Sequence, residues 1–407
     1  MAANPQIPQN NAPPANKNDP VAINRAARLG IIPGPNSQTV RRTQQIAQYV
    51  SANYVAGQQL AININPAPVG IITRFIIKVT ASIGQGVAET QTRVANGASA
   101  FFSNIQYVDT SNQTRVNAPG WYLNQLAALR RRRILGAALT TDINSVAGPS
   151  AAFTPGIIAA PATLNAAPPA NNAPNFFMYY EIPLAYGPDD LRGAVLAALV
   201  NATQSLQLTV NPNFFCTSTD QVNIAEAAYQ SSTAQLGKIS YLTVTVYQEY
   251  IDQFGGLALP QIDLATQYLL QVAGGFQPVA NTDLIIPYAN FRLFMSTIFR
   301  YNNSGVFNVG SDINYVAIRT ANQSDLIHVD PYTLALFNRE HMGDDLGAAY
   351  YTVNHRAKPL FTNSFGNLSL VINASSVTSI NSTISVGYEQ LALMNQIPAA
   401  GAIASGG

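Results

Sequence analysis

The chain has few charged residues. Asp, Glu, Lys and Arg together make up 10% of its 407 residues, against about 25% in typical soluble domains. Only four of the 21 basic residues are lysines (Lys17, Lys78, Lys238 and Lys358). Arginine is favoured and lysine is depleted at protein interfaces, and a surface of low charge is easily desolvated. The composition therefore favours extensive protein–protein contact, although a neutral β-sandwich interior would give the same low charge.

The chain also lacks cysteine pairs and long apolar runs. Its single cysteine, Cys216, excludes an intrachain disulfide framework and fits assembly in a reducing compartment. No stretch approaches the ~18 uncharged apolar residues of a membrane-spanning helix. The opening residues Met1–Pro5 have neither a basic nor an apolar region, so we predict no signal peptide.

Residue spacings typical of enzymes are missing too. His328, His341 and His355 do not form the close pair that a metal-binding double β-barrel needs. Neither a G-x-S-x-G elbow nor a glycine-rich phosphate loop occurs, although spacing alone leaves a Ser-His-Asp arrangement open. Gly343-Asp344-Asp345 lacks an upstream partner carboxylate, and Cys216 is more typical of a small packed residue than of a nucleophile. We predict no enzymatic activity, no metal and no cofactor. The net charge of +1 also predicts no sequence-specific nucleic-acid binding.

The chain does contain a weak internal repeat, an echo of the strand pattern of its first half in its second half. The segments Val244–Tyr250 and Ile384–Gln390 have similar strand patterns, and so do Thr73–Val79 and Asn290–Ser296. From Leu60 onward, many short alternating runs are separated by Asn, Gly and Pro turns. This pattern is typical of antiparallel sandwiches or barrels. The sequence therefore predicts an all-β protein of two stacked units.

Composition divides the chain into five predicted segments. Residues 1–57 form an N-terminal arm, partly disordered and partly helical, and residues 394–407 form a flexible tail. Between them we expect a first β-unit over 58–254, a linker with a short helix over 255–282 and a second β-unit over 283–393. Residues 143–180 contain no charge and several prolines, which predicts a long loop at an intersubunit contact or at the outer end.

Helical spacing predicts two short helices in the arm, between Pro20 and Gly57, and two farther along the chain. One arm helix follows Ser37 as N-cap, and the linker helix lies between Asp263 and Gly274. A further helix is expected over Leu191–Val200. Trp121, which follows Pro119-Gly120, is predicted to anchor the core. The apolar faces of the arm and linker helices comprise Val40, Ala47, Val50 and Tyr54 in the arm and Leu264, Tyr268 and Val272 in the linker.

Two groups of arginines are candidate contact sites. The arm holds five basic residues against one acidic residue. Four of these, Arg25, Arg28, Arg41 and Arg42, would suit an interfacial membrane contact if they lay on short amphipathic helices; a clamp on a neighbouring subunit is equally open. Arg130-Arg131-Arg132-Arg133 is the densest charge run. It would suit either phosphate or anionic lipid, or carboxylates on a neighbour.

Several segments, in order along the chain, resemble a known family. The most specific is Glu181–Tyr186 followed by Asp190-Leu191 and Gly193–Leu196. In these and other segments the chain is similar to the major capsid protein of tectiviruses, tailless icosahedral double-stranded DNA phages with an internal lipid membrane. The similarity covers residues 60–392. The other matching segments are Lys78–Ala81, Gly120–Trp121, Val246–Gln248 with Tyr250-x-Asp252-Gln253, Pro260-x-Ile262-Asp263-Leu264, Tyr288–Asn290, Ser296–Ile298, Asp312–Tyr315, Arg319–Asn322, Lys358–Pro359 and Gly387–Glu389.

The resemblance implies a double jelly-roll, which is two eight-stranded β-sandwiches side by side and perpendicular to a shell. It implies a pseudo-hexagonal homotrimer that tiles an icosahedral capsid around a membrane and a DNA genome. The implied partners are other copies of the chain, a penton or vertex protein, and the inner viral membrane or its proteins through the arm. Residues 1–57, however, depart from the family's sequence. The implied location is the virion capsid, after assembly in the host cytoplasm.

An alternative of a different class is a trimeric receptor- or carbohydrate-binding jelly-roll of the spike kind. Such a protein would present exposed aromatic platforms for sugars. The chain has a single tryptophan, which disfavours this alternative.

Overall fold

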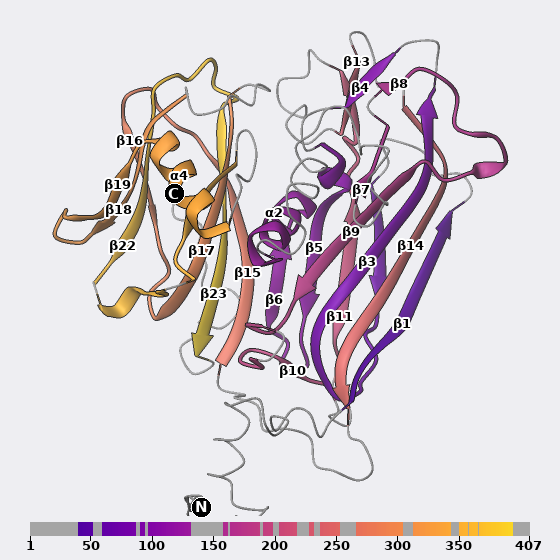
Figure 1. Ribbon diagram of the computed structural model, residues 1–407, viewed down its shortest axis with the longest axis horizontal. Helices are drawn as coiled ribbons and strands as arrows, with labels where there is room; N and C mark the ends of the chain where they lie inside the picture. The colour runs from indigo at the N-terminus through magenta and orange to yellow at the C-terminus, as the bar shows by residue number, and fades with distance from the viewer. Residues whose placement is uncertain are drawn as a thin grey trace, which may run out of the picture.

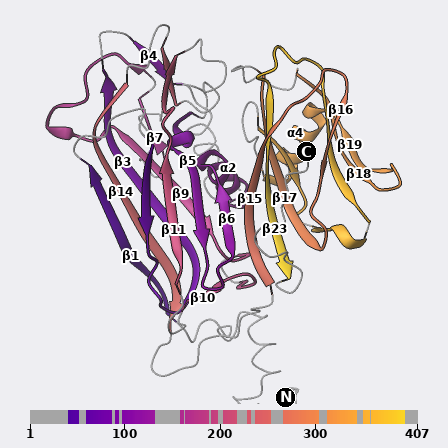
Figure 2. The same cartoon turned by 180° about the vertical axis from the view of Figure 1, so that it is seen from behind.

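Two β-sandwich units stand side by side in the computed structural model, with helix α2 (Gly120–Arg131) between them in both views (Figures 1 and 2). The structure describes residues 40–393 apart from 52–58, 87–89, 94–96, 132–157, 162, 188–189, 198–202, 218–227, 232–236, 253–265, 304–311, 343–349, 357 and 365. The all-β class expected from the sequence is confirmed.

The first unit is built from two facing sheets and a small additional sheet. One sheet has the order β1-β14-β3-β9-β7, with β10 beside β3, and the other has the order β2-β11-β5-β6. The small sheet, β12-β13-β4-β8, lies at one end of the unit (Figure 1). The elements are β1 (Val40–Ser51), β2 (Leu60–Ile64), β3 (Ile71–Gln85), β4 (Gln91–Arg93), η2 (Gly97–Phe101), β5 (Phe102–Val108), β6 (Thr114–Ala118), β7 (Ile158–Ala159), β8 (Thr163–Leu164), η4 (Ala170–Asn172), β9 (Phe176–Pro183), β10 (Val195–Leu196), β11 (Ser205–Val210), β12 (Phe215–Thr217), β13 (Tyr229–Ser231) and β14 (Gly237–Asp252).

The second unit has the same plan without a small sheet among its described residues. Its two sheets have the orders β15-β23-β17-β20, with β21 beside β17, and β16-β22-β18-β19. The elements are β15 (Thr266–Phe276), β16 (Asp283–Pro287), β17 (Arg292–Asn302), β18 (Ile313–Thr320), β19 (Asp325–Val329), α4 (Pro331–Met342), β20 (Tyr350–Asn354), β21 (Leu360–Phe361), η6 (Thr362–Ser364), β22 (Leu368–Ala374) and β23 (Thr383–Leu393).

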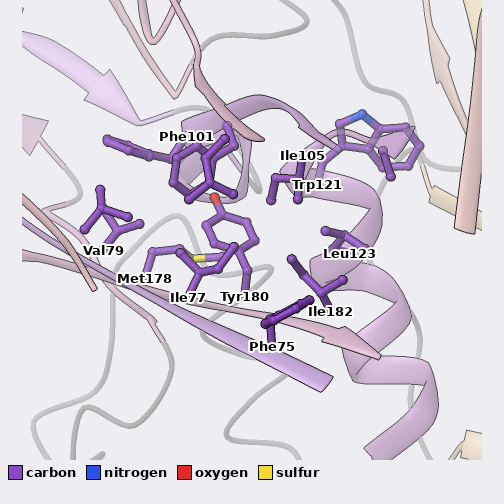
Figure 3. Close-up of a cluster of buried hydrophobic side chains, with 14 of the residues drawn as sticks. Phe75, Ile77, Val79, Phe101, Ile105, Trp121, Leu123, Met178, Tyr180 and Ile182 are labelled. Carbon is purple, nitrogen blue, oxygen red and sulfur yellow. The ribbon is translucent and has the colours of Figure 1, made fainter. Parts of the chain in front are cut away.

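Strict alternation along β3 shows how the sequence produces a sandwich. Phe75, Ile77 and Val79 are fully buried, whereas Arg74 and Lys78 lie on the opposite, half-exposed face. Side chains alternate between the two faces of a strand, so one face of β3 enters the core. Figure 3 shows these three apolar side chains beside others from β5, β9, η2 and α2. Each fully buried side chain of this size contributes about 1.5–3 kcal/mol to stability.

The two units repeat each other strand for strand. The sheet β1-β14-β3-β9 corresponds to β15-β23-β17-β20, and β2-β11-β5-β6 corresponds to β16-β22-β18-β19. The corresponding strands follow one another in the same order along the chain, and α2 and α4 occupy the same place in that order. Each unit is therefore an eight-stranded sandwich, as the resemblance implies.

A shared irregularity fixes which residues correspond. In the first unit Glu249 lies opposite Arg74 and the next residue opposite Ile72; in the second, Glu389 lies opposite Ser296 and the next residue opposite Phe294. One residue is skipped at the same place in both, so Glu249 corresponds to Glu389, as the sequence echo indicates. The echo between the opening strands is displaced, because the counterpart of Arg74 is Ser296 and not Arg292.

The units are joined by a short parallel pairing between β6 and β15. Val116 lies opposite Leu270 and Asn117 opposite Gln271. This pairing makes one continuous sheet, β2-β11-β5-β6-β15-β23-β17-β20, that runs through both units. The apolar core of the first unit continues into Leu270 and Ile298 of the second unit. The orientation of the two units is therefore fixed by both backbone pairing and buried side chains.

The arm helix predicted after Ser37 is wrong. Ser37 and Tyr54 lie outside the described residues, but Val40–Ser51 forms β1, which pairs antiparallel with β14 along its whole length. The edge of β14 presents a row of backbone donors and acceptors that pair with an extended strand. The hydrogen bonds gained by this pairing outweigh the local preference for a helix. Residues 40–51, placed in the arm by the sequence, are thus part of the first sheet.

The linker helix is wrong for a related reason. Asp263 and Leu264 lie outside the described residues, but Thr266–Phe276 forms β15. Tyr268, Leu269 and Leu270 are buried in succession, because a strand covered on both faces carries a continuous apolar run that spacing cannot distinguish from a helix.

Two other expectations are also corrected. The described part of Leu191–Val200 ends at residue 197 and contains a turn and the short strand β10 instead of a helix. The described part of 143–180 is not a loop throughout, since it includes β7, β8 and the start of β9. Residues 143–157 lie outside the described chain.

Candidate functional site

The side chains of three of the eight predicted contact arginines are described: Arg41, Arg42 and Arg130. Arg131 is the last residue of α2, but its side chain is outside the description. Arg25, Arg28, Arg132 and Arg133 also lie outside the described residues.

Arg41 and Arg42 lie on β1, not on an amphipathic helix. Nη1 of Arg41 is 3.9 Å from Oε1 of Glu249, and Nε of Arg42 is 3.5 Å from Oδ2 of Asp252. The two arginine side chains are 39% and 49% exposed, so each pairing contributes at most about 1 kcal/mol. Both arginines remain accessible at the edge of the sheet, and their contact with a membrane or a neighbour stays a prediction.

Arg130 lies inside the chain, at the joint between the two units. Its Nη1 donates to the Tyr268 hydroxyl at 2.6 Å, and its Nη2 donates to the carbonyl oxygens of Ala185 and Tyr186, each at 3.1 Å. Nη1 is also 3.7 Å from Oε1 of Glu389. Arg130 thus connects α2 and the end of β9 to β15 and β23. Its contacts are intrachain, which differs from the expected phosphate or neighbouring subunit.

Glu389 is the centre of this joint, and its side chain is fully buried. It accepts hydrogen bonds from Ser296 Oγ at 2.7 Å and from Arg356 Nε at 2.9 Å. The Tyr268 hydroxyl and Nη2 of Arg356 also donate to it. One carboxylate therefore organises β15, β17, β23 and two arginines. We call Glu389, Arg130, Arg356, Tyr268 and Ser296 the joint cluster.

The joint cluster keeps its charges despite burial. Burial by itself raises the pKa of the Glu389 carboxyl, but the charges of Arg356 and Arg130 and the hydrogen bonds outweigh it and leave that pKa below its ordinary value. Burial lowers the pKa of Arg356, but attraction to Glu389 outweighs burial and raises it. Burial also raises the pKa of Tyr268, which therefore remains a protonated donor.

Aromatic packing forms the other side of the joint. Trp121 is 1% exposed, as expected for a core anchor, and its ring also contacts two residues of the second unit. The Arg300 guanidinium lies 4.7 Å from the centroid of its ring, and the Tyr350 ring centroid lies 5.6 Å away. A cation over an indole face and a packed ring each add about 0.5–1.5 kcal/mol. Beside Trp121, the Tyr122 ring fills the space that a side chain at Gly387 would need.

Where their side chains are described, His328, His355 and Cys216 lie apart from one another; the side chain of His341 is outside the description. His328 is exposed, stacks on Tyr315 with ring centroids 4.3 Å apart, and contacts Asp325 through Nδ1 at 2.9 Å. His355 is half-buried, and burial lowers its pKa to about 4. Cys216 is buried as well. In the part of the chain that the structure describes, no three His, Cys, Asp or Glu residues are grouped as metal ligands would be.

Among the described residues, no helix has the length and apolarity needed to cross a membrane.

Sequence reasoning missed most of the joint cluster. Glu389 belongs to the repeated closing strand and to a matching segment of the resemblance, but nothing assigned it a role. The available signal was the recurrence of a glutamate at the same place in both closing strands, Glu249 and Glu389. Glu249 has its own arginine, because Arg74 Nη2 donates to its Oε2 at 2.8 Å. Arg356 and Tyr268 had no comparable signal, since their partners are remote in sequence.

We predict that Glu389→Gln lowers the free energy of unfolding by about 3–5 kcal/mol, because it leaves Arg130 and Arg356 buried without their counter-charge. Denaturant-induced unfolding of the purified chain measures the loss. The matched control is Asp190→Asn, which removes the partner of Arg192 in a pair 48% and 35% exposed and should cost at most about 1 kcal/mol. Equal losses in both variants would contradict a central role for Glu389.

The same variant should change the pH dependence of stability. The pKa of Glu389 is lowered in the folded chain, so its contribution is complete above its ordinary pKa of 4.5 and is lost as pH falls through the lower, folded value. Stability of the unmodified chain should therefore decline more steeply below about pH 4.5 than stability of Glu389→Gln.

The fold has clear counterparts among solved structures. The atomic structure of Sulfolobus Turreted Icosahedral Virus includes a chain that matches with a TM-score of 0.59 and 13% identity, over 88% of this chain and 94% of that chain. A chain of the PBCV-1 virus capsid matches with a TM-score of 0.53 and 11% identity, over 87% of this chain and 95% of that one. These likenesses show the fold, which is the double jelly-roll of viral major capsid proteins.

Sequence comparison identifies the family. The family model described as P3 major capsid protein N-terminal matches residues 37–254, and the one described as P3 major capsid protein C-terminal matches residues 265–405. The chain is 32% identical over 365 residues to major capsid protein P3 of Enterobacteria phage PRD1, which covers 88% of this chain and 90% of the relative. Because these matches extend along nearly its whole length, the chain belongs to the P3 major capsid protein family.

Proposed function

We propose that this chain is the major capsid protein of a membrane-containing icosahedral phage, and that three copies form a pseudo-hexagonal trimer. The observation that carries the proposal is the strand-for-strand repeat of the two units. One chain supplies two similar units at a fixed angle. Three copies of the same polypeptide therefore supply the six sides of the trimer. Such trimers would tile a closed shell around an internal membrane and a DNA genome.

The rigid joint supports this function. A tile must keep its outline while many individually weak contacts form around it, and closed assemblies depend on a fixed relation between contact surfaces. The joint cluster, the Trp121 packing and the β6–β15 pairing hold that relation inside each chain. The low charge of the chain supports the burial of large lateral surfaces between tiles.

The ends of the first unit support an orientation in the shell. β1 begins at the end of the unit away from the small sheet β12-β13-β4-β8 (Figure 1). We infer that this end faces inward, so that residues 1–39 reach neighbouring capsomers and the membrane. The small sheet, which includes β8 from the charge-free segment, would then face outward. Further proposed partners are a penton or vertex protein and inner-membrane proteins. Assembly in the host cytoplasm agrees with the single, buried Cys216.

Native mass spectrometry and electron microscopy of the purified chain test the tile directly. We expect a stable trimer of about three times 43.5 kDa with a six-sided outline, and shells under assembly conditions. A monomer that binds a glycan and never forms shells would instead support a receptor-binding jelly-roll.

Deletion of residues 1–30 should leave the trimer intact but weaken its binding to anionic lipid vesicles, because it removes Arg25 and Arg28. A matched pair of variants separates the arginines. Arg25→Gln with Arg28→Gln should reduce binding, whereas Arg41→Gln with Arg42→Gln should have less effect, since those two arginines face Glu249 and Asp252. Vesicle binding that survives the deletion, or membrane-filled particles from that mutant, would contradict a membrane role for the arm.

A further inference from the structure

The hairpins that precede α2 and α4 have the same geometry. Asp109 N donates to Gln113 O at 3.0 Å in one turn, and Thr320 N donates to Ser324 O at 2.9 Å in the other. The left-handed residue of each turn also corresponds, with φ of 59° at Asn112 and 60° at the equivalent Gln323. In both hairpins the strand register shifts at the same place. Residues 102–131 therefore correspond to residues 313–342 without a gap, at a constant difference of 211, because 313 − 102 = 342 − 131 = 211.

This correspondence pairs the residues of the two helices. Leu123 and its counterpart Leu334 are both buried against their own unit. Trp121, which the second unit covers, is 1% exposed, whereas its counterpart Tyr332 is 65% exposed. The exposed apolar surface of α4 continues through Leu336 at 54% and Phe337 at 44%. Within a single chain, α4 thus has the position of α2 but lacks a following unit to cover it.

The first unit carries counterparts of the second-unit residues that cover α2. The shared irregularity next to Glu249 and Glu389 makes Arg74 the counterpart of Ser296, so Lys78 is the counterpart of Arg300. Along the neighbouring strand, Tyr179 is then the counterpart of Tyr350.

The chemistry at these positions is the same as at the joint inside the chain. Trp121 contacts a cation and a tyrosine ring, Arg300 and Tyr350. The counterparts Lys78 and Tyr179 are again a cation and a tyrosine, and both lie on the outer, half-exposed face of β3 and β9. Ile76 on that face is partly exposed, whereas its counterpart Ile298 is fully buried inside the joint.

The strand edges are matched in the same way. β6 pairs with β15 inside the chain, and their counterparts are β19 and β1. Each of these two strands has a neighbour on one side only in the described part of the chain. By correspondence, Ile327 takes the place of Val116, and Thr43 takes the place of Leu270.

We propose that in the trimer β19 of one copy lies parallel to β1 of the next copy, with Ile327 opposite Thr43. In the same contact, Tyr332 of α4 packs on Lys78 and Tyr179 of the next copy, and Leu336 and Phe337 are covered. The inference rests on the proposed trimer and names its interface. It makes the joint between copies a repeat of the joint inside the chain, so that six similar joints close the ring.

A cysteine pair tests the strand register. Thr43→Cys with Ile327→Cys should give disulfide-linked dimers and trimers on a denaturing gel after mild oxidation of the purified protein. Val50→Cys with Ile327→Cys is the control, because position 50 lies seven residues along β1 from position 43, or roughly 23 Å. Each single-cysteine variant controls for Cys216. Linkage in the control pair alone, or in neither pair of an intact trimer, would overturn the register.

A second pair of variants tests the apolar face of α4. Tyr332→Ala with Leu336→Ala should raise the dissociation constant of the trimer about a hundredfold, because two apolar contacts are lost, while the thermal unfolding of the monomer barely changes. Val279→Ala with Ile380→Ala, at side chains 63% and 86% exposed, should leave the trimer unchanged.

The outcomes separate this interface from the proposed function. Trimers that survive the α4 substitutions as well as they survive the control would overturn the interface and leave the tile in place. An unmodified chain that never trimerises would overturn both.

Discussion

The buried carboxylate of Glu389 is the contact that the rest of the molecule depends on. Apolar packing alone would let one sandwich slide or rotate against the other, because hydrophobic contact has little directionality. The joint cluster is directional, since Arg130 reaches from α2 of the first unit to the Glu389 carboxylate of the second unit, which Arg356, from the loop after β20, also contacts. Taking either charge out of water is costly, and the cost is offset only when the partners have this geometry. Together with the β6–β15 pairing, the contacts of Arg130 thus hold one angle between the units.

A fixed angle between the units gives the internal repeat a structural role. Two sandwiches on a flexible linker would be two binding modules, whereas two sandwiches in one continuous sheet are one rigid body with two similar outer surfaces. The first unit differs from the second mainly at one end, where β4, β8, β12 and β13 form the small sheet (Figure 1). The side surfaces that would contact neighbouring copies have the same strand arrangement in both units. The differences between the units therefore lie away from the surfaces that have to be alike.

Sequence reasoning succeeded where a feature was carried by local pattern. The alternation in β3 and the echo that aligns Glu249 with Glu389 were both visible in single segments, and they gave the all-β class and the two units. It failed where remote partners decide. β1 depends on the edge of β14, and β15 is buried on both faces, so helical spacing in each was misleading. The match between α2 and α4 was invisible, because Trp121 and Gln125 correspond to Tyr332 and Leu336, and only backbone register reveals it. The sequence did not distinguish Arg130 from the other arginines of its run, because its partner Glu389 is remote in sequence.

Corresponding residues differ between the joint inside the chain and the proposed joint between copies, because the two joints need different strengths. The joint inside the chain forms once, during folding, and uses Trp121, Arg300 and a fully buried glutamate, Glu389. The counterpart positions hold Tyr332, Lys78 and Glu249, whose arginine Arg74 is 34% exposed. A tyrosine face attracts a cation less strongly than an indole, and lysine holds its water more tightly than arginine does. A joint built from these residues is weaker, and weak contacts can open again when a subunit binds in the wrong place. The same backbone geometry thus gives a permanent joint within the chain and a reversible joint between chains, and the side chains at corresponding positions set the strength of each joint.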